Sequence, residues 1–368
     1  ELTPQMLAVA GALVALGFAN TYYALMAAHL RTDIYFAAVA AGNLAKLAVG
    51  VALVKAGWGW TGAALGYALV GAAVLAAGAY YAPRWTGRPT LSPSALADVL
   101  KAGVASWAPG MVATLGQWLG VLAIFHVATA AETGQYYAAL TIANAVLMIA
   151  TSILSLLLPV LSGMADGRKR AAARALRISL AAAAPAAAFA AAYPALPLTL
   201  LGHEYAQAAP ALTILILSLP PTAIVDTATS LAYAYGNYRQ VLRLGLATEL
   251  PRIALYTALA PLGPTGAAAA YTAGAYVGMV YALYTTPILV MREIWAAVAI
   301  PAALAAAAWA ARLPWPLGLL AVATSYPIYA KAKILTRQDI REIATALLPS
   351  HLVDKTYQKL KPVIDILF

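Results

Sequence analysis

The sequence predicts an all-α polytopic membrane protein, with two pseudo-symmetric helical bundles around a central cavity. Composition is the first observation: of 368 residues, 63% are hydrophobic and 10% are charged, which excludes an ordinary soluble domain. An internal repeat is the second observation, because residues 3–82 partly match residues 208–289. Many transporters are built from duplicated hydrophobic units, with the substrate site between the halves.

Eleven segments reach the length that a membrane-spanning helix needs, about 20 mostly apolar residues. Helices are expected because the chain does not show the alternating ten-residue segments of membrane strands. The expected spans are 3–28, 34–56, 60–82, 102–128, 134–162, 174–200, 208–235, 239–261, 265–289, 293–311 and 314–332.

The spans group into parts separated by polar sequence. Residues 1–82 form a partial N-terminal bundle of three helices. The Pro-, Ser- and Gly-containing stretch 83–101 forms a cytoplasmic linker, with a short helix beginning near Ser94. Residues 102–290 form a C-terminal six-helix bundle, and residues 291–335 add two transmembrane helices.

Residues 336–368 form an amphipathic cytoplasmic tail. The stretch from Thr336 to Asp339 resembles a capping box, and apolar residues follow it at helical spacing. This tail is expected either to lie along the lipid surface, which its lysines favour, or to bind a partner in a membrane complex.

Basic residues set the expected orientation in the cell membrane. Most of them fall on one side of the predicted spans, and the positive-inside rule makes that side cytoplasmic. The C-terminus is therefore expected inside and the first residue outside. The net charge of +10 is a topology signal, and no basic groove with interleaved aromatic residues predicts nucleic-acid binding. The basic side comprises Arg31, Arg84, Arg88, Lys101, Arg168, Lys169, Arg170, Arg174, Arg177, Arg239, Arg243, Arg292 and the tail from Lys331 to Lys361.

The repeat places a basic residue at the same mid-helix position in each copy. Lys46 aligns with Arg252 and, after a two-residue slip, 59–67 aligns with 263–271. Residues 102–200 have no such partner, because the offset would place it before residue 1. We therefore expect that the first three helices of a fourteen-helix fold are absent from this chain.

Several short motifs resemble those of a known family. The run from Gly134 to Tyr137, the span ending at Ser162 and the basic loop 168–170 resemble the start of the C-terminal lobe of oligosaccharide flippases. These flippases belong to the multidrug/oligosaccharidyl-lipid/polysaccharide exporter superfamily. The Gly-His-Glu-Tyr turn at 202–205 and the Gly-x-Thr-Gly-Ala-Ala turns after residues 58 and 262 are similar to elements of that family. The resemblance implies alternating-access transport of a lipid-linked oligosaccharide to the outer leaflet.

Such a substrate carries a phosphate or pyrophosphate head group through the membrane. An uncompensated charge there costs on the order of several kcal/mol, which cations facing a water-filled cavity offset. Lys46 and Arg252 are therefore the predicted head-group ligands, with Asn20 and Asn43 as further substrate-binding residues. For Arg252, an ion pair with Glu249 three residues earlier is the competing interpretation.

Asp226 and Glu249 are the carboxylates deep in the predicted spans, and both are candidates for proton or Na⁺ coupling. Neutralisation of Arg252 is the alternative role for both. His126, toward the outer end of its span, is a candidate pH-sensitive gate or an interfacial histidine. Gln117, Trp118 and Asn144 are candidates for contact with sugar hydroxyls or faces, or for helix packing and interface anchoring.

Enzyme activity is not predicted. The sequence contains no GxxxxGK[ST] phosphate loop, no HExxH motif and no Asp-x-Asp pair, and no cofactor or metal site is expected.

Two alternatives to a flippase stay open. One is a drug or cation antiporter of the same superfamily, against which the two fixed cations argue. The other is a non-transporting membrane subunit or scaffold in a larger assembly.

Overall fold

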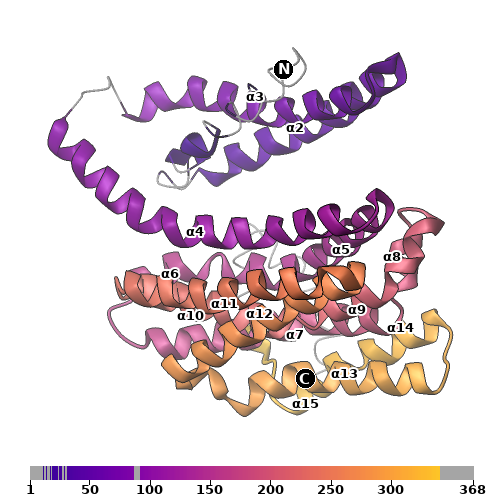
Figure 1. Ribbon diagram of the computed structural model, residues 1–368. Coiled ribbons are helices and arrows are strands. Elements are labelled where there is room, and N and C mark those ends of the chain that lie inside the picture. The colour runs from indigo at the N-terminus through magenta and orange to yellow at the C-terminus, as the bar shows by residue number, and fades with distance from the viewer. Residues whose placement is uncertain are drawn as a thin grey trace. The chain divides into compact units, whose positions relative to one another are not determined.

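Helices make up nearly all of the chain that the structure describes (Figure 1). The computed structural model describes residues 31–86 and 92–339, together with positions 11, 14, 17, 19–23, 25, 26 and 29. No β-strand occurs among these residues. Contacts divide the chain into two compact units, a first unit Glu1–Asp98 and a second unit Val99–Phe368.

The first unit holds α2 (Thr32–Leu53), the π-helical turn η1 (Val54–Trp58) and α3 (Gly59–Thr86). Helix α4 (Pro93–Val127) begins in the first unit and continues into the second. The second unit then contains α5 (Ala130–Leu154), α6 (Leu157–Gly163), α7 (Arg168–Ala192), α8 (Ala195–Thr199), η2 (His203–Ala208), α9 (Ala209–Ile216), α10 (Leu219–Ala234), α11 (Tyr238–Leu259), η3 (Ala260–Leu262), α12 (Gly263–Thr285), η4 (Pro287–Val290), α13 (Arg292–Ala310), α14 (Trp315–Ala323) and α15 (Ser325–Lys331).

Several helix boundaries differ from those expected; the spans expected at 134–162, 208–235 and 314–332 are each divided into two helices, and α7 and α4 are shifted. Helix α7 covers 168–192 rather than 174–200, because Gly167 starts it from a left-handed conformation and the chain turns at Tyr193-Pro194. Helix α4 is one helix of 35 residues from Pro93, so the short helix expected near Ser94 and the span expected at 102–128 are continuous. Proline suits this first helical position because its missing N–H would have no partner there.

Six segments within the described residues are long and apolar enough to cross a membrane, or seven when the bent pair α9–α10 counts as one span. One of them, Tyr238–Thr285, has 48 residues and contains both α11 and α12. At about 1.5 Å per residue it exceeds twice the thickness of a bilayer core, so it has the length of two crossings. The predicted span 3–28 lies largely outside the described residues, and the total of eleven spans stays a prediction.

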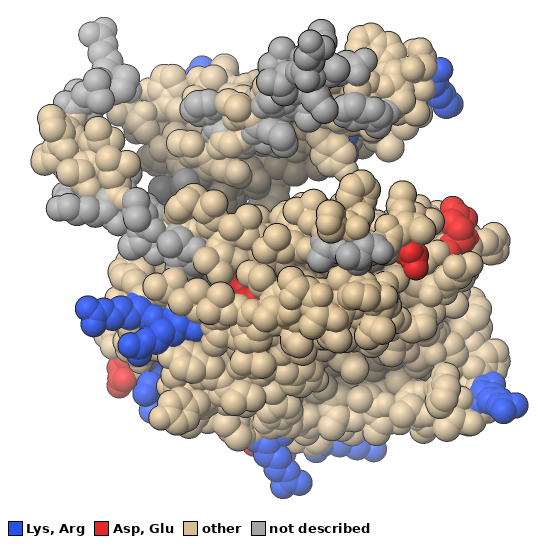
Figure 2. All heavy atoms as spheres, viewed as in Figure 1, with Lys and Arg blue, Asp and Glu red and all other residues tan. Residues whose placement is uncertain are grey.

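The surface also suits a lipid environment. On the face seen in Figure 2, uncharged surface dominates, and Lys, Arg, Asp and Glu lie mainly toward its edges. Large apolar side chains such as Leu44, Phe125 and Val280 are exposed. A soluble monomer rarely exposes so much apolar surface, whereas a bilayer solvates it.

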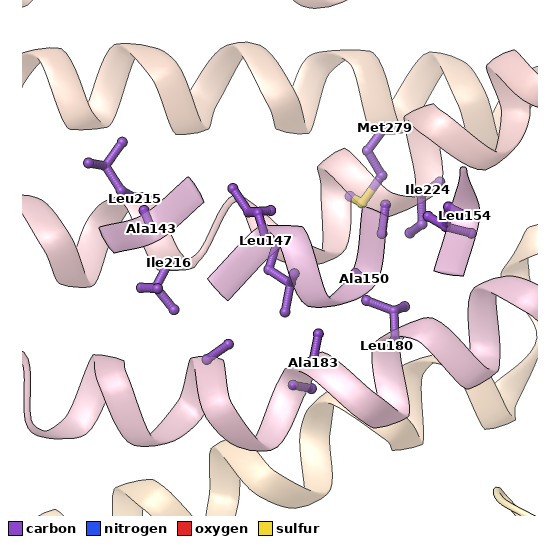
Figure 3. Packing of buried hydrophobic residues seen from close by; sticks show 14 of the residues in the cluster. Ala143, Leu147, Ala150, Leu154, Leu180, Ala183, Leu215, Ile216, Ile224 and Met279 are labelled. Carbon is purple, nitrogen blue, oxygen red and sulfur yellow. The ribbon is translucent and has the colours of Figure 1, made fainter. Parts of the chain in front are cut away.

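The core of the second unit forms where α5, α7, α9, α10 and α12 meet (Figure 3). Leu147 of α5, Ala183 of α7, Leu215 of α9, Ile224 of α10 and Met279 of α12 all belong to it. Many other core residues are buried alanines. Helices in lipid gain little from the hydrophobic effect, so small residues that permit close van der Waals contact stabilise their packing.

Each unit contains an antiparallel hairpin in which glycines of one helix approach the backbone of the other. In the first unit, a Cβ added at Gly66 of α3 would lie 3.2 Å from the Lys46 carbonyl oxygen of α2. In the second unit, a Cβ at Gly274 of α12 would lie 2.7 Å from the Thr248 carbonyl oxygen of α11. The glycines therefore set how closely each pair of helices packs.

The turns of these two hairpins explain the two-residue slip in the repeat. The turn η1 has 5 residues and the turn η3 has 3, so the turn of the first hairpin is two residues longer and shifts the alignment after it by two. Gly59 and Gly263 follow these turns with φ of 53° and 65°, a left-handed conformation that favours glycine. The hydroxyls of Thr61 and Thr265 then donate to the carbonyl three residues earlier. The pseudo-symmetry of whole bundles stays a prediction.

Ion pairs and hydrogen bonds hold the segment after α15 against α7. Thr336 and Asp339 form the predicted capping box, in which the Asp339 backbone N–H donates to Thr336 Oγ1 and the carboxylate accepts from the Thr336 N–H. Arg174 and Arg177 of α7 pair with the same carboxylate at 2.6 Å and 3.0 Å. Burial by itself raises the pKa of Asp339, but the hydrogen bonds of Thr336 and Arg174 and the charge of Arg177 hold it below its usual value. The rest of the predicted tail, 340–368, lies outside the described residues.

Replacing Gly274 by Ala should destabilise the second unit by about 1–3 kcal/mol, as overpacking does. The new Cβ would lie 2.6 Å from Arg252 Cβ, and the Thr248 carbonyl oxygen and Arg252 Cα beside it are backbone atoms that cannot move aside cheaply. Thermal unfolding of the purified protein in detergent measures this. Gly134→Ala is the matched control, since nothing lies within 4 Å of its added Cβ, and it should be neutral or slightly stabilising. An unchanged midpoint for Gly274→Ala would contradict the close approach of α11 and α12.

Asp339→Asn should loosen the segment after α15 by roughly 1–3 kcal/mol, because two arginines lose their shared anion. Faster amide hydrogen exchange around residues 334–339 would report it. Since the folded protein lowers the pKa of Asp339, its contribution is complete at neutral pH and is lost as the pH falls through that lowered pKa. Asp33→Asn is the control, because Asp33 pairs with Arg31 on an exposed surface. Equal exchange in both variants would argue against this anchor.

Candidate functional site

A cavity of about 350 Å³ lies in the second unit, lined from α4, α10, α11 and α12. Helices α10, α11 and α12, which supply most of its lining, pack on one another. Three acidic or basic side chains line it, Asp226 from α10 and Glu249 and Arg252 from α11. The structure therefore brings together three residues that the sequence singled out.

The Arg252 guanidinium is held on three sides. Its Nη1 donates to Glu249 Oε1 at 2.7 Å, and its Nε donates to the Tyr271 carbonyl oxygen at 3.3 Å. The guanidinium also lies over the Tyr271 ring, 4.0 Å from the ring centre. Arg252 and Glu249 are only 5% and 4% exposed. The predicted ion pair is thus present, and spacing by three residues puts both side chains on one face of the helix.

Close approach of α4 completes the enclosure of Glu249. A Cβ at Gly116 of α4 would lie 1.7 Å from Glu249 Oε2, and a Cβ at Gly120 would lie 2.4 Å from the Tyr256 ring. Oε2 is buried and has no hydrogen-bond partner among the described residues. A carboxylate oxygen without a partner in a low-dielectric site is costly, so this atom is the natural acceptor for a proton or cation.

Asp226 follows a break in the span. Helices α9 and α10 are bent by 42° where they meet, and Pro220-Pro221 lies in the first turn of α10 beside this bend. The Thr272 hydroxyl of α12 donates to the Ile214 carbonyl oxygen near this break at 2.9 Å. Asp226, half-buried, makes no hydrogen bond or ion pair within the part of the chain that the structure describes. When all three groups are ionised, two carboxylates and one guanidinium leave the cavity one negative charge.

The other predicted ligands lie in the first unit. Lys46 is half-buried, with Nζ 4.4 Å from the centre of the Tyr67 ring, and no carboxylate pairs with it among the described residues. Tyr67 and Tyr271 are partners in the repeat, so both hairpins place a cation over an equivalent ring. Asn43 is exposed and its Nδ2 donates to the Val39 carbonyl oxygen at 3.0 Å, and Asn20 is exposed.

His126 is exposed on the last turn of α4 and does not line the charged cavity. No observation tests its role as a gate. Sequence reasoning missed Tyr271 and Thr248 as parts of the cavity, and Gly116 as the place where α4 approaches Glu249. The alignment of Tyr67 with Tyr271 was a usable signal for one of them, whereas Gly116 matters only because another helix approaches it.

Comparison with known proteins gives two matches. The sequence profile of a family described as polysaccharide biosynthesis protein matches residues 1–210, more than half of the chain. Among solved structures, the chain is similar to one titled "Lipid II flippase MurJ, inward closed conformation", with a TM-score of 0.74 and 13% identity over 88% of this chain and 72% of that one. At this identity the likeness concerns the fold alone. No curated protein sequence matches the chain.

Arg252→Gln should destabilise the protein by about 3–5 kcal/mol, because it leaves Glu249 buried without its cation. The double variant Arg252→Gln/Glu249→Gln should be closer to wild type, since neither charge remains. Thermal or denaturant unfolding of the two single variants and the double variant gives the coupling energy. Simple addition of the two single effects would show that the ion pair does not hold this cavity together.

Proposed function

The chain belongs to the polysaccharide biosynthesis protein family, and from this we propose that it flips a lipid-linked oligosaccharide from the cytoplasmic to the outer leaflet of the cell membrane. The substrate class is a polyprenyl or dolichyl phosphate or pyrophosphate sugar. The charged cavity of the second unit is the observation that carries the proposal. A guanidinium buried in a membrane span destabilises the folded protein. Binding of a phosphate-bearing head group is a function that would explain its presence.

Lys46 and Arg252 act on the head group at different stages of the cycle. Lys46 has no carboxylate partner among the described residues, so its ammonium is available to an arriving phosphate. Arg252 is masked by Glu249 at 2.7 Å. A phosphate that reaches Arg252 must displace this carboxylate, and Asn20 and Asn43 would contribute polar contacts on the side of the first unit.

Displacement of Glu249 links the substrate to a cation. Once its guanidinium is taken by phosphate, Glu249 is a buried anion that needs a proton or Na⁺, and Asp226 already lacks a partner in the described part of the chain. Binding of the anionic head group therefore favours uptake of a cation at Glu249 or Asp226, and the reverse holds by linkage. Such reciprocity is what ion-coupled alternating access requires.

The proposed cycle runs from inside to outside. The basic loops and the anchored start of the C-terminal tail lie on the cytoplasmic side, where the head group enters. Rocking of the two bundles then exposes the head group to the outer face, with His126 as the proposed gate near that end of α4. The lipid tail stays in the bilayer throughout, so that only the head group passes through the cavity, and the proposed cycle includes no enzymatic step and no cofactor.

Proteoliposome transport tests the proposal with a fluorescent polyprenyl-pyrophosphate sugar. Lys46→Gln should slow flipping roughly 10- to 100-fold, the worth of a charge-assisted hydrogen bond. Arg252→Gln/Glu249→Gln, which avoids an unpaired buried charge, should slow it to a similar degree. Lys55→Gln is the control, since Lys55 is an exposed lysine in the turn of the same hairpin as Lys46.

Wild-type flipping rates in both test variants would show that Lys46, Arg252 and Glu249 do not bind the substrate, and the proposed flippase function would remain. Absence of flipping by folded wild-type protein would contradict the proposed function. Stable copurification with another membrane complex would then favour a non-transporting subunit.

A further inference from the structure

The two faces of α5 differ in a way that matters inside a membrane. Its buried face is almost wholly apolar, from Ala138 to Leu154. Its exposed face carries polar side chains at helical spacing. Tyr137, Thr141 and Ser152 are exposed on it, Asn144 and Thr151 are half-buried at its border, and the exposed apolar residues Ala145, Met148 and Ile149 lie among them.

Lipid contact would favour the opposite arrangement. Thr141 and Ser152 satisfy their hydroxyls by donating to the carbonyl four residues earlier, so they tolerate lipid. Asn144 decides the question, because its amide makes no hydrogen bond within the described part of the chain and α5 lies in a candidate span. An amide that faces lipid without a hydrogen-bond partner costs on the order of several kcal/mol, as other buried polar groups do. We therefore expect this face of α5 to border water or substrate.

A pocket of about 230 Å³ lies on this face between α4 and α5. It is lined by Trp118, Val121, Tyr137, Leu140, Thr141 and Asn144. The rings of Trp118 and Tyr137 are stacked, with centroids 6.5 Å apart and planes 24° from parallel. They are 50% and 49% exposed, so each retains accessible aromatic surface.

These groups match the chemistry of a sugar ring. A pyranose has a face of weakly positive C–H groups, which suits the negative face of an aromatic ring, and a rim of hydroxyls. The Asn144 amide supplies two donors and one acceptor, and the Thr141 oxygen keeps acceptor capacity while its proton is used. A purely structural aromatic pair would need neither the unpaired amide nor the open ring faces.

We propose that Trp118, Tyr137, Thr141 and Asn144 form a saccharide subsite, which binds one sugar ring of the lipid-linked substrate. This inference rests on the proposed function. The pocket is close to the charged cavity along α4, because Thr114 lines that cavity and Trp118, one turn later, lines this pocket. One helical turn separates the two positions by about 6 Å along the axis. A glycosyl phosphate places its sugar directly beside its phosphate, so the two sites suit adjacent parts of one molecule.

Binding to the full chain in nanodiscs tests the subsite with two probes, polyprenyl pyrophosphate bearing N-acetylglucosamine and bare polyprenyl pyrophosphate. Wild type should bind the sugar-bearing lipid more tightly. Trp118→Ala and Asn144→Leu should each weaken that binding roughly 3- to 10-fold and leave the Kd for the bare lipid unchanged. Trp118→Phe and Asn144→Gln should restore part of the difference, because they keep a ring face and an amide. Trp107→Ala, an exposed tryptophan on the same helix, is the matched control and should behave as wild type.

Each outcome has a definite meaning. Loss of the sugar-dependent difference in Trp118→Ala and Asn144→Leu alone supports the subsite. If those variants keep the difference, or if wild type binds both lipids equally, the subsite is overturned while the proposed function survives. If folded wild type binds neither lipid, the proposed function fails and the subsite fails with it.

Discussion

The ion pair between Arg252 and Glu249 is the interaction on which the interior of the second unit depends. A guanidinium buried within a membrane span needs an anion, and Glu249 supplies it at 2.7 Å. The surrounding structure follows from that pair. Tyr271 covers the cation with its ring, Gly116 leaves room for the carboxylate, and Gly274 lets α12 approach α11 closely. Three helices are therefore positioned around two charges.

This arrangement divides the electrostatics unevenly between the two units. The first unit holds Lys46 over an aromatic ring without a carboxylate partner in its described residues, while the second holds a cation already neutralised and one further acid. Equivalent hairpins thus carry different charge balances. In the proposed flippase, Lys46 would attract the head group, and Asp226 and Glu249 would link its passage to a cation. Their separate tasks give a physical reason for a duplicated hairpin to have diverged.

Helix α4 connects the two sites of the proposed substrate recognition. One of its faces meets α11 through Gly116 and Gly120, and another carries Thr114 and Trp118 toward the charged cavity and the aromatic pocket. The polar exposed face of α5 lies beside that pocket. Polarity on an exposed membrane helix face is informative because lipid does not solvate it. In the proposed saccharide subsite, this side of the second unit borders water or substrate.

The sequence by itself determined the membrane class, the helix positions to within several residues and the resemblance to oligosaccharide flippases, which the family profile confirms. It could do so because apolar length and the Lys46–Arg252 repeat are local properties of the chain. Only the tertiary structure decided that Glu249 neutralises Arg252, that Asp226 joins them and that Asn144 meets Trp118. Those outcomes depend on which helix faces meet, and glycines such as Gly116 acquire meaning only when a neighbouring helix approaches them.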